Sequence, residues 1–347
     1  MQQLTISVDG MSGDHGVKAV VPGVLSALKK HPHLTILLVG DQAILQQEIE
    51  GAPSDLLNRL DVIHASQQVE MDEAPSLALR NKKDSSMRVA LDLVKQGRAR
   101  ACVSSGNTGA LMATARFVLK TLRGIDRPAL VGIMPTTEEN ITVRVLDLGA
   151  NIDSKPEHLF QFAVMGSVLA NQLNGTPAPR VALLNVGIEE MKGNEQVKKT
   201  AQMLEACPGL NYIGFVEGGD IYTGAADVIV CDGFVGNVAL KSTEGAVRLV
   251  AHFIRKAFAR NWFTKLSGLL AMYTLKSLGK HMNPSRYNGA TMLGLRGTVI
   301  KSHGGANSEA FARAIDEAIV QVDRNIPALI EDKVAHILEP EMETGKS

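Results

Sequence analysis

The stretch ISVDGMSGDHG, residues 6–16, passes from an apolar, strand-like run into a turn of glycine and small polar residues, and a helical pattern follows it. Four further stretches repeat this arrangement: ACVSSGNTGA (101–110), VRVLDLGAN (143–151), VALLNVGIEEMKGNE (181–195) and DVIVCDGFVGN (227–237). Strands that alternate with helices form a mostly parallel sheet with both faces covered. The sequence therefore predicts an α/β fold, and we expect the five turns to gather at one edge of the sheet, where ligands bind.

The composition limits the class of protein. The chain has 347 residues, 45% of them hydrophobic, with 36 basic and 36 acidic side chains and a formal net charge of zero. This length fits one large α/β domain, which we assign to residues 1–347. The balanced charge lacks the basic excess of a nucleic-acid-binding protein. Three unpaired cysteines, no signal peptide and no apolar run of membrane-spanning length predict a soluble, cytoplasmic protein.

Strand-like and helical segments alternate through residues 4–120, with a helical stretch at 76–98 that is broken near Asp84. Two strands within 129–149 are separated only by TTEEN, which is short enough for a hairpin and indicates a mixed sheet. Residues 287–307 contain one last strand, TVIKSHG. Helices are expected at 155–173, 308–323 and 326–338, and a disordered polar tail at 340–347.

Residues 244–282 differ from the rest of the chain. EGAVRLVAHFIRKAFAR has the spacing of an amphipathic helix, NWFTK interrupts it, and a second helical stretch follows. We therefore expect a helical hairpin that stands off the sheet. Its apolar faces suit a dimer interface. Its tip, with Trp262, Phe263 and Leu266, has the character of a membrane-surface contact.

Several motifs of known chemistry are absent from the sequence. The first turn, with Gly10, Gly13 and Gly16, does not match the dinucleotide fingerprint, and there is no P-loop, nucleophile elbow or zinc motif. What recurs is a small polar residue beside glycine, a turn type whose backbone N–H groups and helix N-termini suit an anion. A single such turn is more often only a helix cap. Five of them together indicate an anionic, phosphate-bearing substrate.

Individual side chains in these turns leave alternatives open. Lys192, beside Gly193, could meet a phosphate or an oxyanion, or could simply be solvated. His303, before Gly304 and Gly305, could act as a general acid or bond a loop carbonyl. Aspartates at strand ends could act as acids, bases or metal ligands, or could cap helices. Cys231 follows an apolar run, and burial is a more common fate for such a cysteine than nucleophilic catalysis.

Taken in order, the segments VDGMSGDHG, SSGNTGA, LDLGAN, KGNE, FVEGGDI, VCDGFVGN, YNGATMLGL and KSHGGAN resemble the PlsX-type phosphate acyltransferases of bacterial phospholipid synthesis over nearly the whole chain. Two positions depart from the family pattern, since Gly10 stands where alanine is expected and Ser12 where glycine is expected. The resemblance implies a three-layer α/β/α, doubly wound, mostly parallel sheet, of the type found in isopropylmalate dehydrogenase and phosphate acetyltransferase. It also implies a homodimer that needs no metal and no cofactor.

The resemblance also implies a reaction. Inorganic phosphate attacks the thioester of a long-chain acyl group on acyl carrier protein, and the acyl phosphate product feeds a membrane glycerol-3-phosphate acyltransferase. Contact with the inner face of the cell membrane would suit that role. We predict catalytic roles for Lys192, His303 and Asp232. The residues predicted to bind substrate or phosphate are Asp9, Gly13, Ser105, Gly106, Asn107, Thr108, Asn151, Asn185, Gly193, Asn194, Gly233 and Asn237.

Two other functions compete with this one. A short-chain phosphate acetyl- or butyryltransferase that uses coenzyme A thioesters would share the fold and the attacking phosphate, but it has no need of a hairpin with an apolar tip. A regulatory protein that binds acyl carrier protein without turnover is the non-catalytic alternative. A nicotinamide-dependent dehydrogenase is disfavoured by the missing fingerprint.

Overall fold

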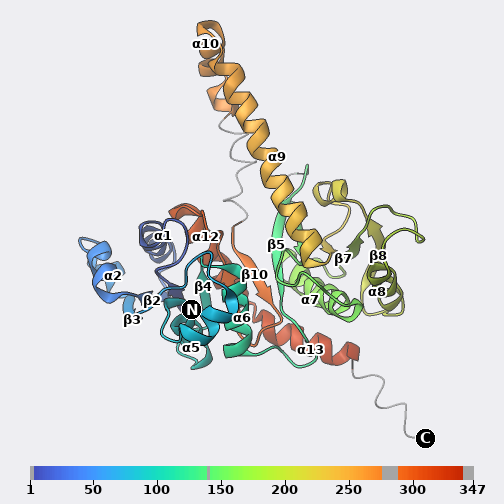
Figure 1. The fold of residues 1–347 in the computed structure, drawn as a ribbon, viewed down its shortest axis with the longest axis horizontal. Helices are drawn as coiled ribbons and strands as arrows, with labels where there is room; N and C mark the ends of the chain where they lie inside the picture. Colours follow the sequence, from blue (N-terminus) through green and yellow to red (C-terminus); the bar gives the residue numbers. More distant parts are fainter. Residues whose placement is uncertain (1–3, 139–140, 276–287, 339–347) are drawn as a thin grey trace, which may run out of the picture.

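The computed structural model describes residues 4–138, 141–275 and 288–338, and its centre is one 11-stranded sheet (Figure 1). The strand order is β3-β2-β1-β4-β11-β10-β5-β6-β9-β7-β8. The strands are β1 (Leu4–Asp9), β2 (Leu34–Gly40), β3 (Leu60–His64), β4 (Ala101–Ser104), β5 (Ala129–Pro135), β6 (Thr142–Leu146), β7 (Arg180–Leu184), β8 (Asn211–Val216), β9 (Val228–Val230), β10 (Ala290–Leu293) and β11 (Thr298–Lys301).

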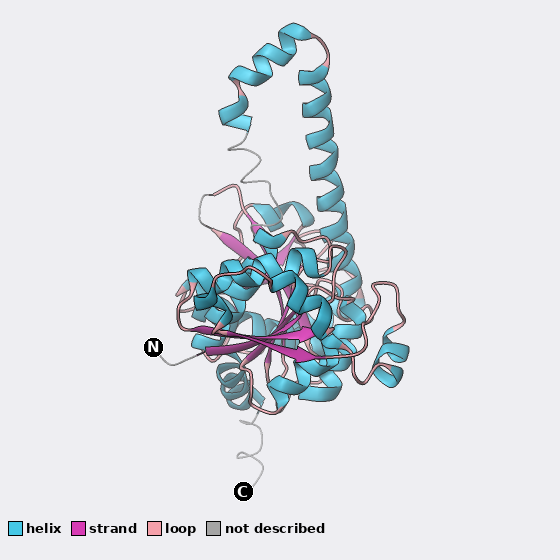
Figure 2. Ribbon diagram, turned by 90° about the vertical axis from the view of Figure 1, so that its left-hand side faces the viewer, coloured by secondary structure: helices cyan, strands magenta, loops and turns pink. Residues whose placement is uncertain are grey.

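Helices lie on both faces of this sheet (Figure 2). The helices are α1 (Val17–Lys30), α2 (Gln42–Ile49), α3 (Ser54–Leu57), α4 (Pro75–Asn81), α5 (Ser86–Lys95), α6 (Thr108–Leu119), α7 (Pro156–Asn174), α8 (Glu195–Glu205), the 3-10 helix η1 (Gly218–Tyr222), α9 (Gly233–Ala259), α10 (Trp262–Leu270), α12 (Ser308–Asp323) and α13 (Ile326–Leu338). The expected three-layer α/β/α architecture is confirmed.

The alternation of side chains along a strand explains how both faces are covered. Ile6 and Val8 of β1 pack in one apolar cluster with residues of α1 and α12. Ser7, between them, points to the other face and donates its hydroxyl to the Ala90 carbonyl of α5 at 2.7 Å. Cys102 of β4 belongs to that second face, in the cluster that contains α5 and α6. β1 and β4 are therefore buried on both sides, which matches their nearly continuous apolar runs in the sequence, whereas the edge strands β3 and β8 are partly exposed.

The sheet contains two parallel blocks that run in opposite directions. The strands β3, β2, β1, β4 and β11 are parallel to one another, and so are β6, β9, β7 and β8. Between the blocks, β10 is antiparallel to both β11 and β5, and β5 is antiparallel to β6. The predicted hairpin at 129–149 and the mixed sheet are thus confirmed.

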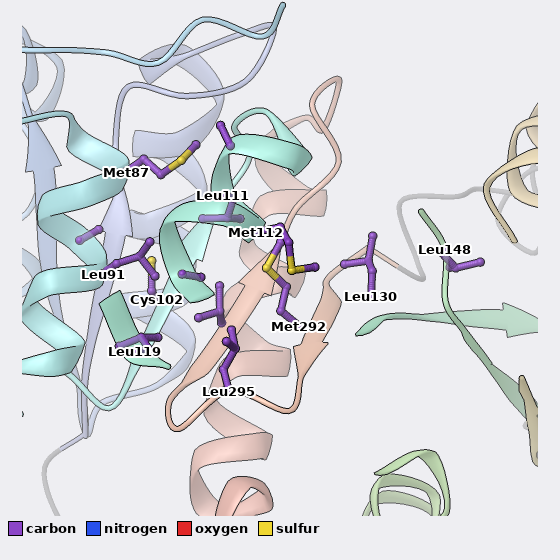
Figure 3. Packing of buried hydrophobic residues seen from close by; sticks show 14 of the residues in the cluster. Met87, Leu91, Cys102, Leu111, Met112, Leu119, Leu130, Leu148, Met292 and Leu295 are labelled. Atoms are coloured by element: carbon purple, nitrogen blue, oxygen red, sulfur yellow. The ribbon is translucent and has the colours of Figure 1, made fainter. Parts of the chain in front are cut away.

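One apolar cluster continues across the junction between the two blocks. It contains Leu111 and Met112 of α6, Met292 of β10, Leu130 of β5, and further residues as far as Ile229 of β9. Figure 3 shows Met112, Met292 and Leu130 following one another from α6 across β10 to β5. The two blocks share a core as well as a sheet.

The helical hairpin stands away from the sheet, as expected. Helix α9 is 27 residues long, and its outer half and α10 form the arm at the top of Figures 1 and 2. The break between the two helices falls at Arg260–Asn261, where the Asn261 side chain accepts a hydrogen bond from the Thr264 amide and caps α10. The end of the predicted hairpin, residues 276–282, and the tail at 340–347 lie outside the described residues.

Two strands were not anticipated from the sequence, β8 and β10. β10 has only four residues and lies between Gly289 and Gly294, both with positive φ. Its local signal is that of a glycine-rich loop, and only its pairing with β5 and β11 makes it a strand. No helix among the described residues has the length and apolar character needed to cross a bilayer.

Candidate active site

The turns after β1 and β4 are joined by a cluster of hydroxyl groups, which we call the serine cluster: Ser12, Ser104 and Ser105. The Ser12 hydroxyl lies 3.3 Å from that of Ser104 and 3.2 Å from that of Ser105. The Ser105 amide also donates to the Ser12 hydroxyl, at 3.2 Å. The departure from the family pattern at Ser12 therefore places a hydroxyl inside the predicted phosphate site.

Glycine is required where these two turns approach each other. Gly13 has φ of +92°, and a Cβ atom there would lie 2.6 Å from the Ser105 hydroxyl. Asp9, at the end of β1, is fully buried beneath the cluster. Its carboxylate accepts hydrogen bonds from Ser86 at 2.6 Å and Ser104 at 2.7 Å, while burial raises its pKa. Asp9 thus orients the serine hydroxyls from below.

Helix α6 begins directly after the serine cluster. Asn107 caps it by accepting the Ala110 amide at 3.0 Å, and its side-chain amide donates to the carbonyls of Met71 and Glu73. Thr108 is the first helical residue, and Gly106 is buried in the turn before it. The N-terminus of α6, which is the positive end of the helix dipole, therefore lies at the turn that holds Ser105. A positive helix end favours the binding of an anion there.

The neighbouring strand β11 adds a buried cation to the same place. Lys301 pairs with Ser104 in the sheet register and is only 6% exposed. Its ammonium donates to the carbonyl oxygens of Ser105, at 3.3 Å, and of Ser302. Burial lowers its pKa to about 8, although Asp14 and Asp9 oppose that shift. Lys301 lies in the predicted strand TVIKSHG but is not among the predicted site residues, because burial cannot be read from KSHGG.

His303 follows β11 and connects the serine cluster to α9. Its Nδ1 accepts the Gly305 amide at 3.0 Å, which leaves the proton on Nε2, and Nε2 lies 3.6 Å from a carboxylate oxygen of Glu244. Burial lowers the pKa of His303, against the opposing charge of Glu244. Glu244 was not predicted, but a signal existed, since it is the only acidic residue in the sequence of α9.

A second group of predicted residues surrounds the start of α9. Asp232 caps this helix by accepting the Phe234 amide at 2.8 Å, and its other oxygen accepts the Ser154 amide at 3.1 Å. The Gly233 amide donates to the Asn151 carbonyl at 2.9 Å. In this group Asp232 acts as a helix cap, and its carboxylate holds the turn after β6 against the start of α9.

Asp147, one of the strand-end aspartates whose role the sequence left open and which is not among the predicted site residues, is the anchor of this second group. Its fully buried carboxylate accepts the amides of Leu130, Ala150 and Asn151 and the side-chain amide of Asn151. Burial raises its pKa. Asn237, one helical turn into α9, is exposed beside Gly149. Asn237 is thus the member of this group that is available to a ligand.

The loop after β7 forms a third group. The Asn185 side chain donates to the carbonyls of Gly187 and Lys192 and thereby shapes the loop. Gly193 has φ of +94° next to that side chain, and Asn194 caps α8. The Lys192 ammonium lies 2.7 Å from the Glu189 carboxylate, and this bond raises its pKa. Lys192 is therefore accessible, charged and already paired with an acid.

The expectation that all five turns share one edge is wrong. The turns after β1 and β4 leave one parallel block, whereas those after β6, β7 and β9 leave the block of opposite direction. The cause is the antiparallel pair β5 and β6, because β10 is antiparallel to both β11 and β5 and therefore leaves those two strands running in the same direction. Helix α9 links the two sets, because Asn237 and Glu244 on it are about 10 Å apart along the axis, and Glu244 contacts His303.

Cys231 does not have the environment of a nucleophile. Its side chain is 3% exposed, and burial raises the pKa of its thiol far above the usual range. Among the described residues, no group of three or more His, Cys, Asp or Glu side chains is arranged to hold a metal ion. The arrangement instead offers hydroxyl groups, helix N-termini and cations, which are suited to bind anions and to stabilise an oxyanion.

Solved structures of other proteins share this fold. The solved phosphotransacetylase of Streptococcus pyogenes superimposes with a TM-score of 0.61 at 17% identity, covering 92% of this chain and 94% of that one. A branched-chain phosphotransacylase from Enterococcus faecalis V583 gives a TM-score of 0.56 at 17% identity, covering 92% and 99%. At this identity the likeness shows the fold, which is shared with phosphotransacylases.

Sequence relatives identify the family. A chain named phosphate acyltransferase in Coxiella burnetii (strain Dugway 5J108-111) is 57% identical over 336 residues, 96% of this chain and 98% of the relative. One of the same name in Legionella pneumophila (strain Paris) is 54% identical over 334 residues, 96% and 97% of the two chains. The family described as "Fatty acid synthesis protein" matches residues 4–329. The chain therefore belongs to the PlsX family of phosphate acyltransferases, acyl-transferring enzymes of fatty acid and phospholipid synthesis.

Proposed function

We propose that this enzyme transfers a long-chain acyl group from acyl carrier protein to inorganic phosphate, releasing acyl phosphate and free carrier protein. The observation that carries the proposal is the serine cluster beside the N-terminus of α6. There, hydroxyl groups and the helix dipole converge on one turn. This place suits a small, multiply charged oxyanion. The proposal needs no serine triad, because phosphate is itself an anionic nucleophile at neutral pH.

In the proposed step a phosphate oxygen attacks the thioester carbon and forms the C–O bond, which gives a tetrahedral oxyanion, and the C–S bond breaks when this oxyanion collapses. The proton of hydrogen phosphate ends on the released thiol, so the charges balance. Ser105 and Asn237 would contact the phosphate, and Asn107 would hold the start of α6 that faces it. Lys192 would stabilise the oxyanion that forms on the thioester carbonyl. Gly13, Gly106, Thr108 and Gly233 would let the backbone approach the bound anions.

His303 would act on the leaving thiolate in this proposal. Its Nδ1 is occupied by the Gly305 amide, so Nε2–H, which lies 3.6 Å from Glu244 without a hydrogen bond to it, is the available donor. The lowered pKa keeps the ring neutral at pH 7, and the neutral ring can still donate this hydrogen bond. Glu244 would orient the ring. Asp9, Asp232, Asn151, Asn185, Gly193 and Asn194 would shape the turns that surround the substrates.

The test compares two thioesters in one assay. Purified full-length protein is incubated with phosphate and either palmitoyl-acyl carrier protein or short-chain acyl-coenzyme A, and hydroxylamine traps the acyl phosphate as a hydroxamate. We expect product from the carrier-protein thioester at a kcat/KM far above that for acetyl- or butyryl-coenzyme A. A preference for the short coenzyme A thioesters would instead support the acetyl- or butyryltransferase function. Binding of carrier protein without any product would support the regulatory alternative.

The hairpin supports two further parts of the proposal. Its exposed apolar side chains include Leu249, Phe253 and Leu269, and its inner face lines an apolar hollow of about 670 Å³ between α9 and α10. A second copy of the chain would cover these surfaces and form the homodimer. The basic residues Arg248, Arg255, Lys256 and Arg260 would meet the acidic carrier protein, or anionic lipid.

The tip of the hairpin is the proposed membrane contact. Trp262 and Phe263 stack with their ring centroids 3.6 Å apart, and both are more than 60% exposed, with Leu266 beside them. Aromatic and aliphatic side chains at the end of a basic arm suit the lipid interface. Such contact would hold a cytoplasmic enzyme at the inner face of the membrane, where a glycerol-3-phosphate acyltransferase would consume the acyl phosphate.

Vesicle binding tests this contact. The double variant Trp262→Ser/Phe263→Ser should lose co-sedimentation with anionic vesicles, because it removes the stacked and exposed aromatic pair at the tip, while acyl transfer in detergent-free solution persists. The matched control is Phe117→Ser, which removes an exposed aromatic side chain from α6 at a distance from the hairpin. Vesicle binding that survives the double substitution would show that the tip is not the contact.

A further inference from the structure

The site contains two lysines, and their environments differ. Lys192 is exposed and lies 2.7 Å from the carboxylate of Glu189. Lys301 is 6% exposed, and no carboxylate among the described residues lies within ion-pair distance of its ammonium. A buried ammonium without an ion-pair partner is costly to keep. A bound anion from outside the protein would offset the free-energy cost of burying the Lys301 ammonium at this position.

The surroundings of Lys301 consist mainly of donors. Its ammonium has three N–H groups, and the described residues provide two acceptors, the carbonyl oxygens of Ser105 and Ser302. The carboxylate of Asp9 is occupied by the hydroxyls of Ser86 and Ser104 rather than by Lys301. One N–H of Lys301 therefore remains for a ligand beside the serine cluster.

Lys301 is also close to the only helix that starts from this turn. The ammonium holds the carbonyl of Ser105, three residues before α6 begins at Thr108. The serine hydroxyls, the start of α6 and the Lys301 ammonium come from β1, β4 and β11, which are adjacent in the sheet. This combination of a cation, hydroxyls and a helix N-terminus is what a phosphate group requires.

We propose that Lys301 is the cation that binds the phosphate nucleophile, at the serine cluster and the N-terminus of α6. This assignment rests on the proposed function and deepens it, because it separates the two lysines. Lys301 holds the attacking phosphate, whereas Lys192 remains the candidate for the oxyanion on the thioester. The lysine ammonium binds the phosphate by charge and hydrogen bonds and forms no covalent bond to it. An oxygen of the bound phosphate therefore stays free to attack the thioester.

The charged groups around Lys301 come from three elements. Asp9 at the end of β1 and Asp14 in the following turn favour its protonated form, whereas Lys241 of α9 opposes it. Bound phosphate adds two negative charges and must raise the affinity of Lys301 for its proton. The KM for phosphate of the wild-type enzyme should therefore rise above about pH 8, where free Lys301 loses its charge.

The test replaces Lys301 by neutral residues. Lys301→Met keeps the length of the side chain, and Lys301→Gln also keeps an N–H donor for the Ser105 carbonyl. We expect both variants to raise the KM for phosphate about 10- to 100-fold, the loss typical of one charge-assisted hydrogen bond. The KM for the acyl thioester should change little, and the rise above pH 8 should disappear. The variant Lys192→Met should lower kcat instead. The matched control is Lys95→Met, which replaces an exposed lysine of α5.

A binding measurement separates this inference from the proposed function. Phosphate added at constant ionic strength should raise the Tm of the wild-type protein and not that of either Lys301 variant. If the wild type makes no acyl phosphate but shows this Lys301-dependent shift, the proposed function fails and the phosphate site stands. An unchanged phosphate KM in the variants, or a Tm shift that persists in them, would overturn the role of Lys301. A protein that binds no phosphate at all would overturn both.

Discussion

At the scale of single residues, three charged groups are buried at strand ends, and they differ in how the fold satisfies them. Asp147 accepts four N–H groups, and Asp9 accepts the hydroxyls of Ser86 and Ser104. Both carboxylates therefore brace turns. Lys301 has only two carbonyl partners among the described residues. The group whose hydrogen bonds are incomplete is the one placed to meet a ligand.

The free energy of unfolding should report the burial of Lys301. The folded protein lowers its pKa from 10.5 to about 8, so the unfolded chain binds more protons between these values. Stability relative to Lys301→Met should therefore be lowest below pH 8 and increase as the pH rises toward 10.5. The gain approaches a few kcal/mol, at about 1.4 kcal/mol per pKa unit.

Urea titrations of both proteins from pH 7 to 10.5, without phosphate, measure this difference. The comparison cancels the titration of all other groups that the two proteins share. A difference in stability that stays constant across this range would mean that the pKa of Lys301 is not lowered in the folded protein.

At the scale of elements, α9 connects the parts of the site. Its first turn is pressed against the turn after β6, its middle places Glu244 beside His303, and its outer half forms the hairpin. One rigid helix therefore joins the second group of predicted residues to the serine cluster and to the surfaces proposed for dimer and membrane contact. The close approach at its start is permitted by glycine, since a Cβ atom at Gly236 would lie 1.9 Å from the Asp147 carbonyl oxygen.

Two glycines in this helix give a matched prediction. Gly236→Ala should lower the free energy of unfolding by about 3 kcal/mol or more, because the added methyl group meets backbone. It should also lower activity by displacing the turn that carries Asn151. Gly245→Ala, in the same helix with nothing within 4 Å, should raise stability by about 0.5–1 kcal/mol. Chemical denaturation and the hydroxamate assay measure both; equal effects at the two sites would contradict this packing.

At the scale of the whole molecule, the sheet and the largest apolar cluster are continuous from the first block to the second. Leu111 of α6 and Ile229 of β9 are fully buried members of that one cluster, although they lie in different blocks. Separate domains would each have a core of their own. We therefore expect residues 1–347 to unfold as a single domain.

Calorimetry of the full chain tests this expectation. We expect one unfolding transition, and we expect Leu111→Ala and Ile229→Ala each to move the whole transition to lower temperature, at a cost of about 2–5 kcal/mol. An exposed substitution such as Leu77→Ala on α4 provides the control. Two resolved transitions, each shifted by only one of the core substitutions, would show two domains instead.

The predicted elements that hold up are those with strong local patterns. Helices at 308–323 and 326–338, the break near Asp84 and the hairpin of β5 and β6 all follow from apolar spacing and short turns. The sequence did not predict the strands β8 and β10. β10 has four residues between two glycines, so it forms a strand only through its pairing with β5 and β11, which no local pattern places next to it in the sheet.

The same contrast applies to the site. The sequence alone determined which turns carry small polar residues, because glycine and helix-capping side chains act within a few residues of one another. It also determined the family, through the order of its motifs. Only the tertiary structure decided that the turns fall into two sets on blocks of opposite direction, that α9 joins them, and that Lys301 is buried while Lys192 is exposed. Burial and strand pairing depend on residues far away in the chain, and no local pattern records them.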